Sequence, residues 1–148
     1  MTAASKCLKA EDYACALELF VEEMKTEKRG MFSPGTAEPS LLGARVEFTV
    51  GMASNSVTPE RIRDVTNFLI GSVVTDHADT PYYLFELHAV RSIACEQIRD
   101  EACQTESRAF VCANKERLAT PLLAKRVEAA KKNLEERVLR VFSECEDT

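Results

Sequence analysis

Two histidines are the first candidates for acid–base or metal chemistry, because histidine titrates near neutral pH and binds metals. His77 stands in the segment Asp76-His77-Ala78-Asp79, where two carboxylates could join it on a cation. Aspartate is also common in turns, where it caps the backbone, and this reading is favoured for residues 75–80. His88 follows Leu87 in a predicted helix, and we expect it at the edge of the core with one hydrogen bond. The histidines therefore predict neither a metal site nor a general base.

Six cysteines occupy positions 7, 15, 95, 103, 112 and 145. No pair has the separation of two to four residues that is typical of zinc ligands, and Cys95, Cys103 and Cys112 strung along one helix could not converge on one ion. Three disulfides are one reading of the even count. However, the chain is not small, and its first residues show no apolar segment behind a basic start. We therefore expect free, buried thiols in a cytoplasmic or nuclear protein.

Other catalytic patterns are not evident in the sequence. The five glycines are scattered and form no phosphate-binding loop. Carboxylates are plentiful, but none stands in an apolar setting that would raise its pKa. A nucleophilic cysteine would need a base brought close by the fold, and no local pattern indicates one. We therefore expect a protein that is not an enzyme and has no cofactor.

Basic residues gather near the C-terminus, although the net charge of the chain is −5. Between residues 125 and 140 they outnumber acids six to three, and five are candidate contacts: Lys125, Arg126, Lys131, Lys132 and Arg137. Such a surface could bind RNA or an acidic protein segment. The alternative is a solvated helix face with internal ion pairs, and it is favoured because no aromatic residue interleaves the basic ones to stack on bases.

Aromatic residues supply two further candidate contacts. Tyr82 begins the densest aromatic cluster, with Tyr83 and Phe85, and aromatic side chains often anchor interfaces. Phe32 lies beside Met31 in a predicted loop over residues 29–40, which contains two prolines and two glycines. We expect Met31 and Phe32 to pack against the core, and an exposed hook for a partner is the alternative.

These residues must be positioned by helices. The pair Thr-Pro occurs at 58–59, 80–81 and 120–121, and each is followed by an amphipathic run, as expected for a capped helix start. Apolar periodicity predicts helices over residues 5–28 and 121–144, and from 59 and 81 onward. Residues 41–54 also alternate like a strand, but no second strand is convincing, so we expect a helix. The prediction is one all-α domain over residues 1–148, with five or six helices in a bundle or a short helical-hairpin stack and an acidic tail over 144–148.

One short segment resembles a known family. Residues 12–20, Asp-Tyr-Ala-Cys-Ala-Leu-Glu-Leu-Phe, are similar to the second helix of a tetratricopeptide repeat, with Tyr13, Ala16 and Phe20 at the matching positions. The helical hairpin of microtubule-interacting-and-trafficking domains looks similar over the same residues. Glu23 and Lys28 depart from the repeat pattern, and no second copy follows. The resemblance implies a scaffold that binds peptides or proteins without catalysis.

The sequence therefore predicts a non-catalytic protein–protein interaction module, an adaptor or a subunit of a larger complex. RNA binding through the last helix is one alternative, and an enzyme or small-ligand carrier with a pocket in the bundle is another. We expect a protein partner and leave a homo-oligomer open. We expect no membrane association, because no apolar run approaches the roughly 20 residues that a spanning helix needs.

Overall fold

The computed structural model describes residues 2–27, 31, 40–72, 82–116 and 140–145. Within these residues all regular structure is helical and no strand occurs, which confirms the all-α prediction. They contain six helices and a short helical segment over residues 140–143, slightly more than the five or six helices expected. The helices are α1 (Ala3–Lys9), α2 (Tyr13–Glu27), α3 (Leu41–Ala53), α4 (Pro59–Gly71), α5 (Tyr82–Gln97) and α6 (Glu101–Ala113).

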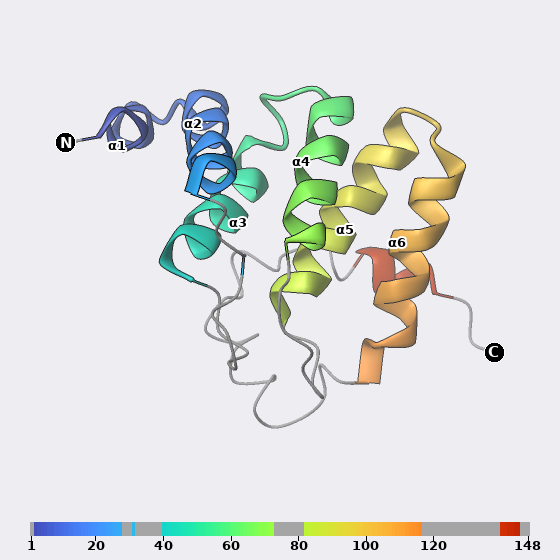
Figure 1. Ribbon diagram of the computed structural model, residues 1–148. Coiled ribbons are helices and arrows are strands. Elements are labelled where there is room, and N and C mark those ends of the chain that lie inside the picture. The colour runs from blue at the N-terminus through green and yellow to red at the C-terminus, as the bar shows by residue number, and fades with distance from the viewer. Residues whose placement is uncertain (1, 28–30, 32–39, 73–81, 117–139, 146–148) are drawn as a thin grey trace.

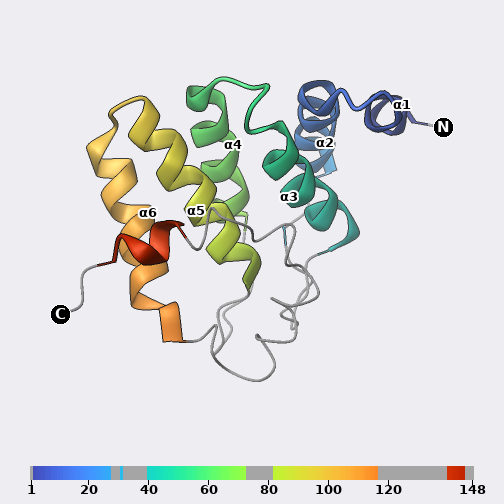
Figure 2. The same ribbon diagram turned by 180° about the vertical axis from the view of Figure 1, so that it is seen from behind.

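The six helices form a row that follows their order in the chain (Figure 1). Each helix packs against the next, and α1 and α6 lie at opposite ends of the row (Figure 2). The helical segment 140–143 lies beside α6, where Arg108 Nη2 donates a hydrogen bond of 3.0 Å to the carbonyl oxygen of Glu144. A row of this kind is held by a series of interfaces between neighbours.

Two groups of buried side chains hold the row together. The larger group spans α1 to α5, and the smaller group joins α5, α6 and the segment 140–143. The smaller group consists of Phe85, Ala89, Val111 and Val141, with Phe110 and Phe142 packed against it. The C-terminal segment is therefore part of the core at the α6 end of the row.

Helix α3 confirms the helical alternative for residues 41–54. Val46 and Val50 are fully buried, as both the helical and the strand pattern require. Phe48, which a strand would place on the same face as these valines, is instead 40% exposed. Ala53, which only the helical pattern groups with the valines, is buried. Burial therefore follows the helical period.

Helix α4 begins as the Thr-Pro pattern predicts. The Thr58 hydroxyl accepts a hydrogen bond of 3.3 Å from the backbone N–H of Arg61, and Pro59 occupies the first turn. The other two Thr-Pro pairs, at 80–81 and 120–121, lie outside the described residues, as does the predicted last helix up to residue 139.

Two predicted continuous helices are each divided by a tight corner. The helix expected over residues 5–28 is α1 followed by α2, and the helix expected from residue 81 ends at Gln97 before α6 begins. Each corner contains one residue with a positive φ, which is 56° at Glu11 and 59° at Arg99. Helical periodicity continues through both corners in the sequence, so the breaks were not predicted.

The two corners share one pattern, Cys-x4-Asp-x2-Cys. In the first, the Asp12 N–H donates to the Cys7 carbonyl at 2.9 Å, and an Asp12 carboxylate oxygen accepts from the Cys15 N–H at 3.1 Å. In the second, Asp100 makes the same two bonds with Cys95 and Cys103, at 2.9 and 3.2 Å. The aspartate therefore both closes the turn and caps the next helix. This repeat was not recognised in the sequence.

Met31 braces the ends of two helices. Its N–H donates to the Ser72 carbonyl at 3.0 Å, and its carbonyl accepts from the Ser40 N–H at 2.8 Å. Its side chain is fully buried, which confirms the expectation that it packs against the core. Residue 31 therefore ties the end of α4 to the start of α3.

Candidate functional site

The cysteines are paired, which corrects the prediction of free thiols. Disulfides join Cys7 to Cys15, Cys95 to Cys103 and Cys112 to Cys145, with Cα–Cα distances of 5.9, 5.8 and 5.7 Å. These distances lie within the usual range for a disulfide. Cysteines eight residues apart are about two turns distant along one helix, and the corners bring them together by reversing the chain. The prediction of free thiols rested on the size of the chain and on its first residues, and neither indicates how the fold places the cysteines.

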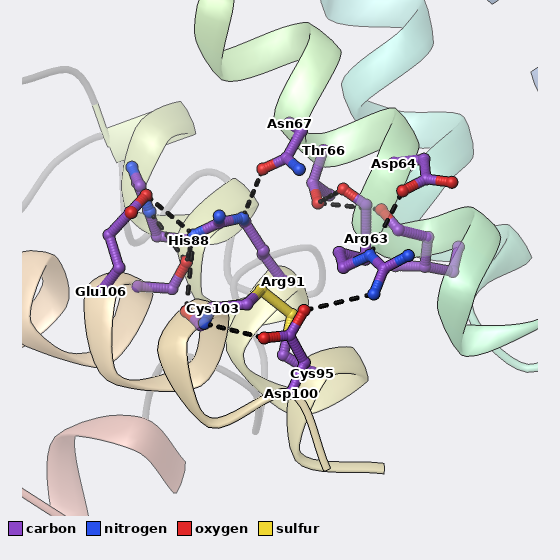
Figure 3. Close-up of a disulfide and its surroundings, with 12 residues drawn as sticks. Arg63, Asp64, Thr66, Asn67, His88, Arg91, Cys95, Asp100, Cys103 and Glu106 are labelled. Atoms are coloured by element: carbon purple, nitrogen blue, oxygen red, sulfur yellow. Dashed lines mark hydrogen bonds and ion pairs between the residues drawn. A yellow bond between two sulfur atoms is a disulfide. The ribbon is translucent and has the colours of Figure 1, made fainter. Parts of the chain in front are cut away.

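Arg91 is the centre of a buried polar network between α4, α5 and α6 (Figure 3). Its guanidinium donates to Asn67 Oδ1 at 2.6 Å, to Ser107 Oγ at 2.7 Å and to Glu106 Oε1 at 3.1 Å. The side chain of Arg91 is 9% exposed, whereas that of Glu106 is 69% exposed, so the network reaches solvent at Glu106. Several partners are needed to compensate a buried charge, and these bonds supply them.

His88 joins this network through Ser107. Its Nδ1 atom lies 3.1 Å from Ser107 Oγ, and its ring stacks on Phe110 with 4.0 Å between centroids. Because Ser107 Oγ accepts a hydrogen bond from Arg91, the serine proton is available to the unprotonated Nδ1 of a neutral imidazole. Burial lowers the pKa of His88 to about 4, and the positive charge of Arg91 adds to this effect. His88 is 6% exposed, so it lies in the core and not at its edge.

The pair of Ser107 and His88 has the composition of a nucleophile with its base. Three observations weigh against that chemistry. Ser107 is fully buried, its oxygen already accepts from Arg91, and an imidazole with a pKa of about 4 is a weak base at neutral pH. The network therefore joins helices and offers no reacting atom to a substrate.

One group of potential metal ligands occurs among the described residues. A sulfur atom each of Cys95 and Cys103 and a carboxylate oxygen of Asp100 lie within 4.8 Å of one another. The two sulfurs are bonded to each other, and Asp100 already contacts the Cys103 N–H and, at 3.2 Å, Arg63 Nη1 (Figure 3). A disulfide presents no thiolate, so this group does not form a metal site in the oxidised protein. The segment 76–79 around His77 lies outside the described residues.

A pocket of about 350 Å³ lies beside the Cys112–Cys145 disulfide, between α6 and the C-terminal segment. Arg108 and Glu144 supply its charged groups, and they pair with each other at 3.4 Å. The pocket contains neither Ser107 nor His88. Its charges are already compensated, so it lacks the convergent, unpaired polar groups of a typical ligand site.

An exposed apolar line runs along α3, which we call the α3 stripe and define as Leu41, Arg45, Phe48 and Met52. Three of its members are large apolar residues with exposed fractions of 70% for Leu41, 40% for Phe48 and 43% for Met52. Arg45 is also exposed. The spacing of four, three and four residues places all four side chains on one side of the helix. This stripe is the candidate interaction surface of the described residues.

The contacts predicted from the sequence are not tested by these residues. Phe32, Lys125, Arg126, Lys131, Lys132 and Arg137 lie outside the described residues. Tyr82 is the first residue of α5, and its side chain is likewise outside the description. The α3 stripe was not predicted, because the apolar pattern of residues 41–54 indicates a buried face and does not show which apolar residues remain exposed.

The buried polar residues were missed for a related reason. Arg91 occupies a position in the apolar line of α5 otherwise formed by residues such as Leu87 and Ala94, and a charge at such a position is a signal of a buried pair. Glu47 and Glu86 are 6% and 1% exposed, which corrects the expectation that no carboxylate lies in an apolar setting.

None of the described helices has both the length and the apolar composition that a membrane crossing requires. Comparison of the chain with protein-family models, with curated proteins and with solved structures found no match.

Proposed function

We propose that the protein is a non-catalytic protein–protein interaction module, an adaptor or a subunit of a larger complex, that docks through the α3 stripe. The observation that carries this proposal is the alignment of Leu41, Phe48 and Met52 on the solvent side of a helix whose other side is buried. Apolar residues that are exposed singly are ordinary, whereas several large apolar side chains aligned on one helix face are typical of a binding surface.

The rest of the described structure supports a scaffold. The row of helices holds α3 between α2 and α4, and the polar network around Arg91 joins α4, α5 and α6. The resemblance of residues 12–20 to a tetratricopeptide repeat fits a helical scaffold and stays a prediction. RNA binding through Lys131, Lys132 and their neighbours also stays a prediction, as does a small-ligand carrier.

We further propose that the protein works in an oxidising compartment, in place of the cytoplasmic or nuclear location expected from the sequence. All six cysteines are paired, and such disulfides persist in secreted, periplasmic or endoplasmic-reticulum proteins and are rare where glutathione keeps thiols reduced. Each disulfide stabilises the fold by roughly 2–4 kcal/mol. Mass spectrometry of protein taken from its native compartment and alkylated before reduction should show no modified cysteine.

The docking proposal is tested by cross-linking the disulfide-intact protein in its native compartment and identifying the cross-linked peptides. The wild type should cross-link through α3 to a protein, a second copy included. Phe48→Arg should lose this cross-link. Leu19→Arg is the matched control, because Leu19 is similarly exposed, at 38%, but lies on α2. Cross-links that survive Phe48→Arg unchanged, or that never involve α3, would contradict the proposal.

A further inference from the structure

We propose that the α3 stripe binds the same stripe of a second copy of this chain, with the two α3 helices antiparallel. The inference rests on the proposed interaction function and names its partner. It is carried by the order of side chains along the stripe, which is self-complementary when one helix is reversed.

The spacing of the stripe is that of a coiled-coil seam. Leu41, Arg45, Phe48 and Met52 are separated by four, three and four residues, which is the alternation of the two seam positions in a heptad. Helices with this spacing pack side by side with a shallow crossing angle. The exposed face of α3 therefore has the geometry of a helix that pairs with another helix.

A two-fold axis between Arg45 and Phe48 brings unlike residues together. Leu41 then meets the partner's Met52, and Arg45 meets the partner's Phe48. The contact between Leu41 and Met52 is apolar. The contact between Arg45 and Phe48 places a guanidinium on an aromatic ring, which is an attractive cation–π contact. A parallel pair would instead place Arg45 against the partner's Arg45, which is repulsive. The sequence of the stripe therefore favours the antiparallel arrangement of an isologous dimer.

Arg45 is available for such a contact. Among the described residues no carboxylate lies within ion-pair distance of its guanidinium, whereas Arg61, Arg63, Arg91, Arg108 and Arg140 all have ion pairs. A cation that an apolar surface leaves unpaired gains from an aromatic ring without needing an acid on the partner. A second copy supplies that ring at the required place.

The size of the seam sets the expected strength. Leu41 to Met52 spans about 16 Å along the helix axis. A seam of three turns buries less than the roughly 1,200–2,000 Å² of a stable complex. We therefore expect a reversible dimer with a dissociation constant in the range of about 10–100 μM, and measurements must extend to such concentrations.

Sedimentation equilibrium of the disulfide-intact protein tests the arrangement. The wild type should dimerise, and Phe48→Arg should raise the dissociation constant at least about tenfold, because Arg45 would then meet an arginine. Arg45→Glu should also weaken the dimer. The double variant Arg45→Glu/Phe48→Arg should restore it to within about threefold of the wild type, since each copy would offer opposite charges to the other. Leu19→Arg should dimerise like the wild type.

The double variant separates the two orientations. In an antiparallel pair, residue 45 of each copy meets residue 48 of the other, so the double variant forms two attractive contacts. In a parallel pair, each of these positions would meet the same position of the other copy, and like charges would face each other at both. Circular dichroism should show an unchanged helix content in every variant, because the substituted side chains are exposed. A wild type that stays monomeric up to about 500 μM, or a double variant weaker than both single variants, would overturn the dimer. The wider docking proposal is tested separately. It stands without the dimer if the wild type cross-links through α3 to a different protein and Phe48→Arg does not, and it fails if no such difference is found.

Discussion

Gly43 lies directly against the backbone carbonyl of Met31, so closely that a Cβ atom at residue 43 would overlap the oxygen. The same carbonyl accepts a hydrogen bond from the backbone N–H of Ser40. Ser40 also caps α3, because its hydroxyl oxygen accepts a hydrogen bond of 3.0 Å from the Gly43 N–H. Glycine is therefore required in the first turn of α3 by the close approach of residue 31.

Substitution of Gly43 by alanine should destabilise the protein by about 1–3 kcal/mol, although the same change in an exposed helix normally stabilises it by up to about 1 kcal/mol. The added methyl group must push the Met31 backbone away and weaken the brace between α3 and α4. Chemical denaturation followed by circular dichroism gives the free energy of unfolding. Gly71→Ala is the matched control, because nothing lies within 4 Å of its Cβ position, and it should be neutral or stabilising. Equal effects of both substitutions would contradict the close packing at Gly43.

His88 should make stability depend on pH. In the folded protein its pKa is lowered from 6.5 to about 4, so the unfolded chain binds the proton first as pH falls. The contribution of the neutral imidazole is complete above pH 6.5 and is lost as pH falls toward 4, by on the order of 2–3 kcal/mol. Free energies of unfolding measured between pH 7.5 and pH 4 should therefore decrease more steeply for the wild type than for His88→Gln.

The control for this measurement is Ala102→Gln, an exposed substitution on α6 that leaves every titratable group in place and should keep the wild-type slope. The carboxylates titrate in all three proteins, so their effect cancels in the comparison. Parallel curves for wild type and His88→Gln would show that the imidazole is not buried in its neutral form.

The disulfides should differ in how readily a thiol reduces them. Cys95 and Cys103 are buried, with exposed fractions of 0% and 6%, whereas the other four cysteines are half-buried. Thiol–disulfide exchange requires access of a thiolate to sulfur, so the Cys95–Cys103 bond should be reduced last under native conditions. Brief reduction, alkylation and peptide mass spectrometry measure the order. In denaturant the difference should disappear, and a persistent difference there would assign the order to another cause.

Arg99 occupies a left-handed backbone conformation, with φ of 59°, in which a side chain costs roughly 1 kcal/mol. Arg99→Gly should therefore raise the free energy of unfolding by about 0.5–1 kcal/mol. The control Ala102→Gly is exposed within α6 and should lower it by about 1 kcal/mol. Thermal and chemical denaturation would check both values.

The equivalent substitution at the other corner tests whether the two corners are alike. Glu11 has a φ of 56°, and Glu11→Gly should stabilise the protein by a similar amount. Destabilisation by glycine at both positions would show that the corners do not hold this conformation in solution.

The helices were predictable from the sequence where the apolar period and the capping residues agree. Thr58 and Pro59 mark the start of α4, and Val46 and Val50 fix the buried side of α3. The corners at Glu11 and Arg99 were not predictable by the same means, because apolar spacing continues through them and neither glycine nor proline marks the turn. The signal lay in the aspartate that follows each corner and in the cysteines on both sides of it, which only comparison of the two segments reveals.

The candidate site was less accessible to sequence reasoning. An amphipathic pattern indicates which residues are buried, and Phe48 belongs to the apolar residues of α3 whichever way the helix faces. Only the packing of α2 and α4 against α3 shows that Leu41, Phe48 and Met52 are left outside. The partners of Arg91 likewise come from α4 and α6, so the network depends on contacts between residues distant in the chain.

The three disulfides lie at the two ends of the row, and none of them links α3 to another element. In a molecule pulled at its termini, disulfides would limit extension at α1–α2 and again from α5 to Cys145. The middle helices have no such link and would separate once side-chain packing and hydrogen bonds such as those of Met31 gave way. Under such a force α3, which carries the α3 stripe, would therefore separate from its neighbours first. The disulfide-linked ends of the row would stay folded after the middle had opened.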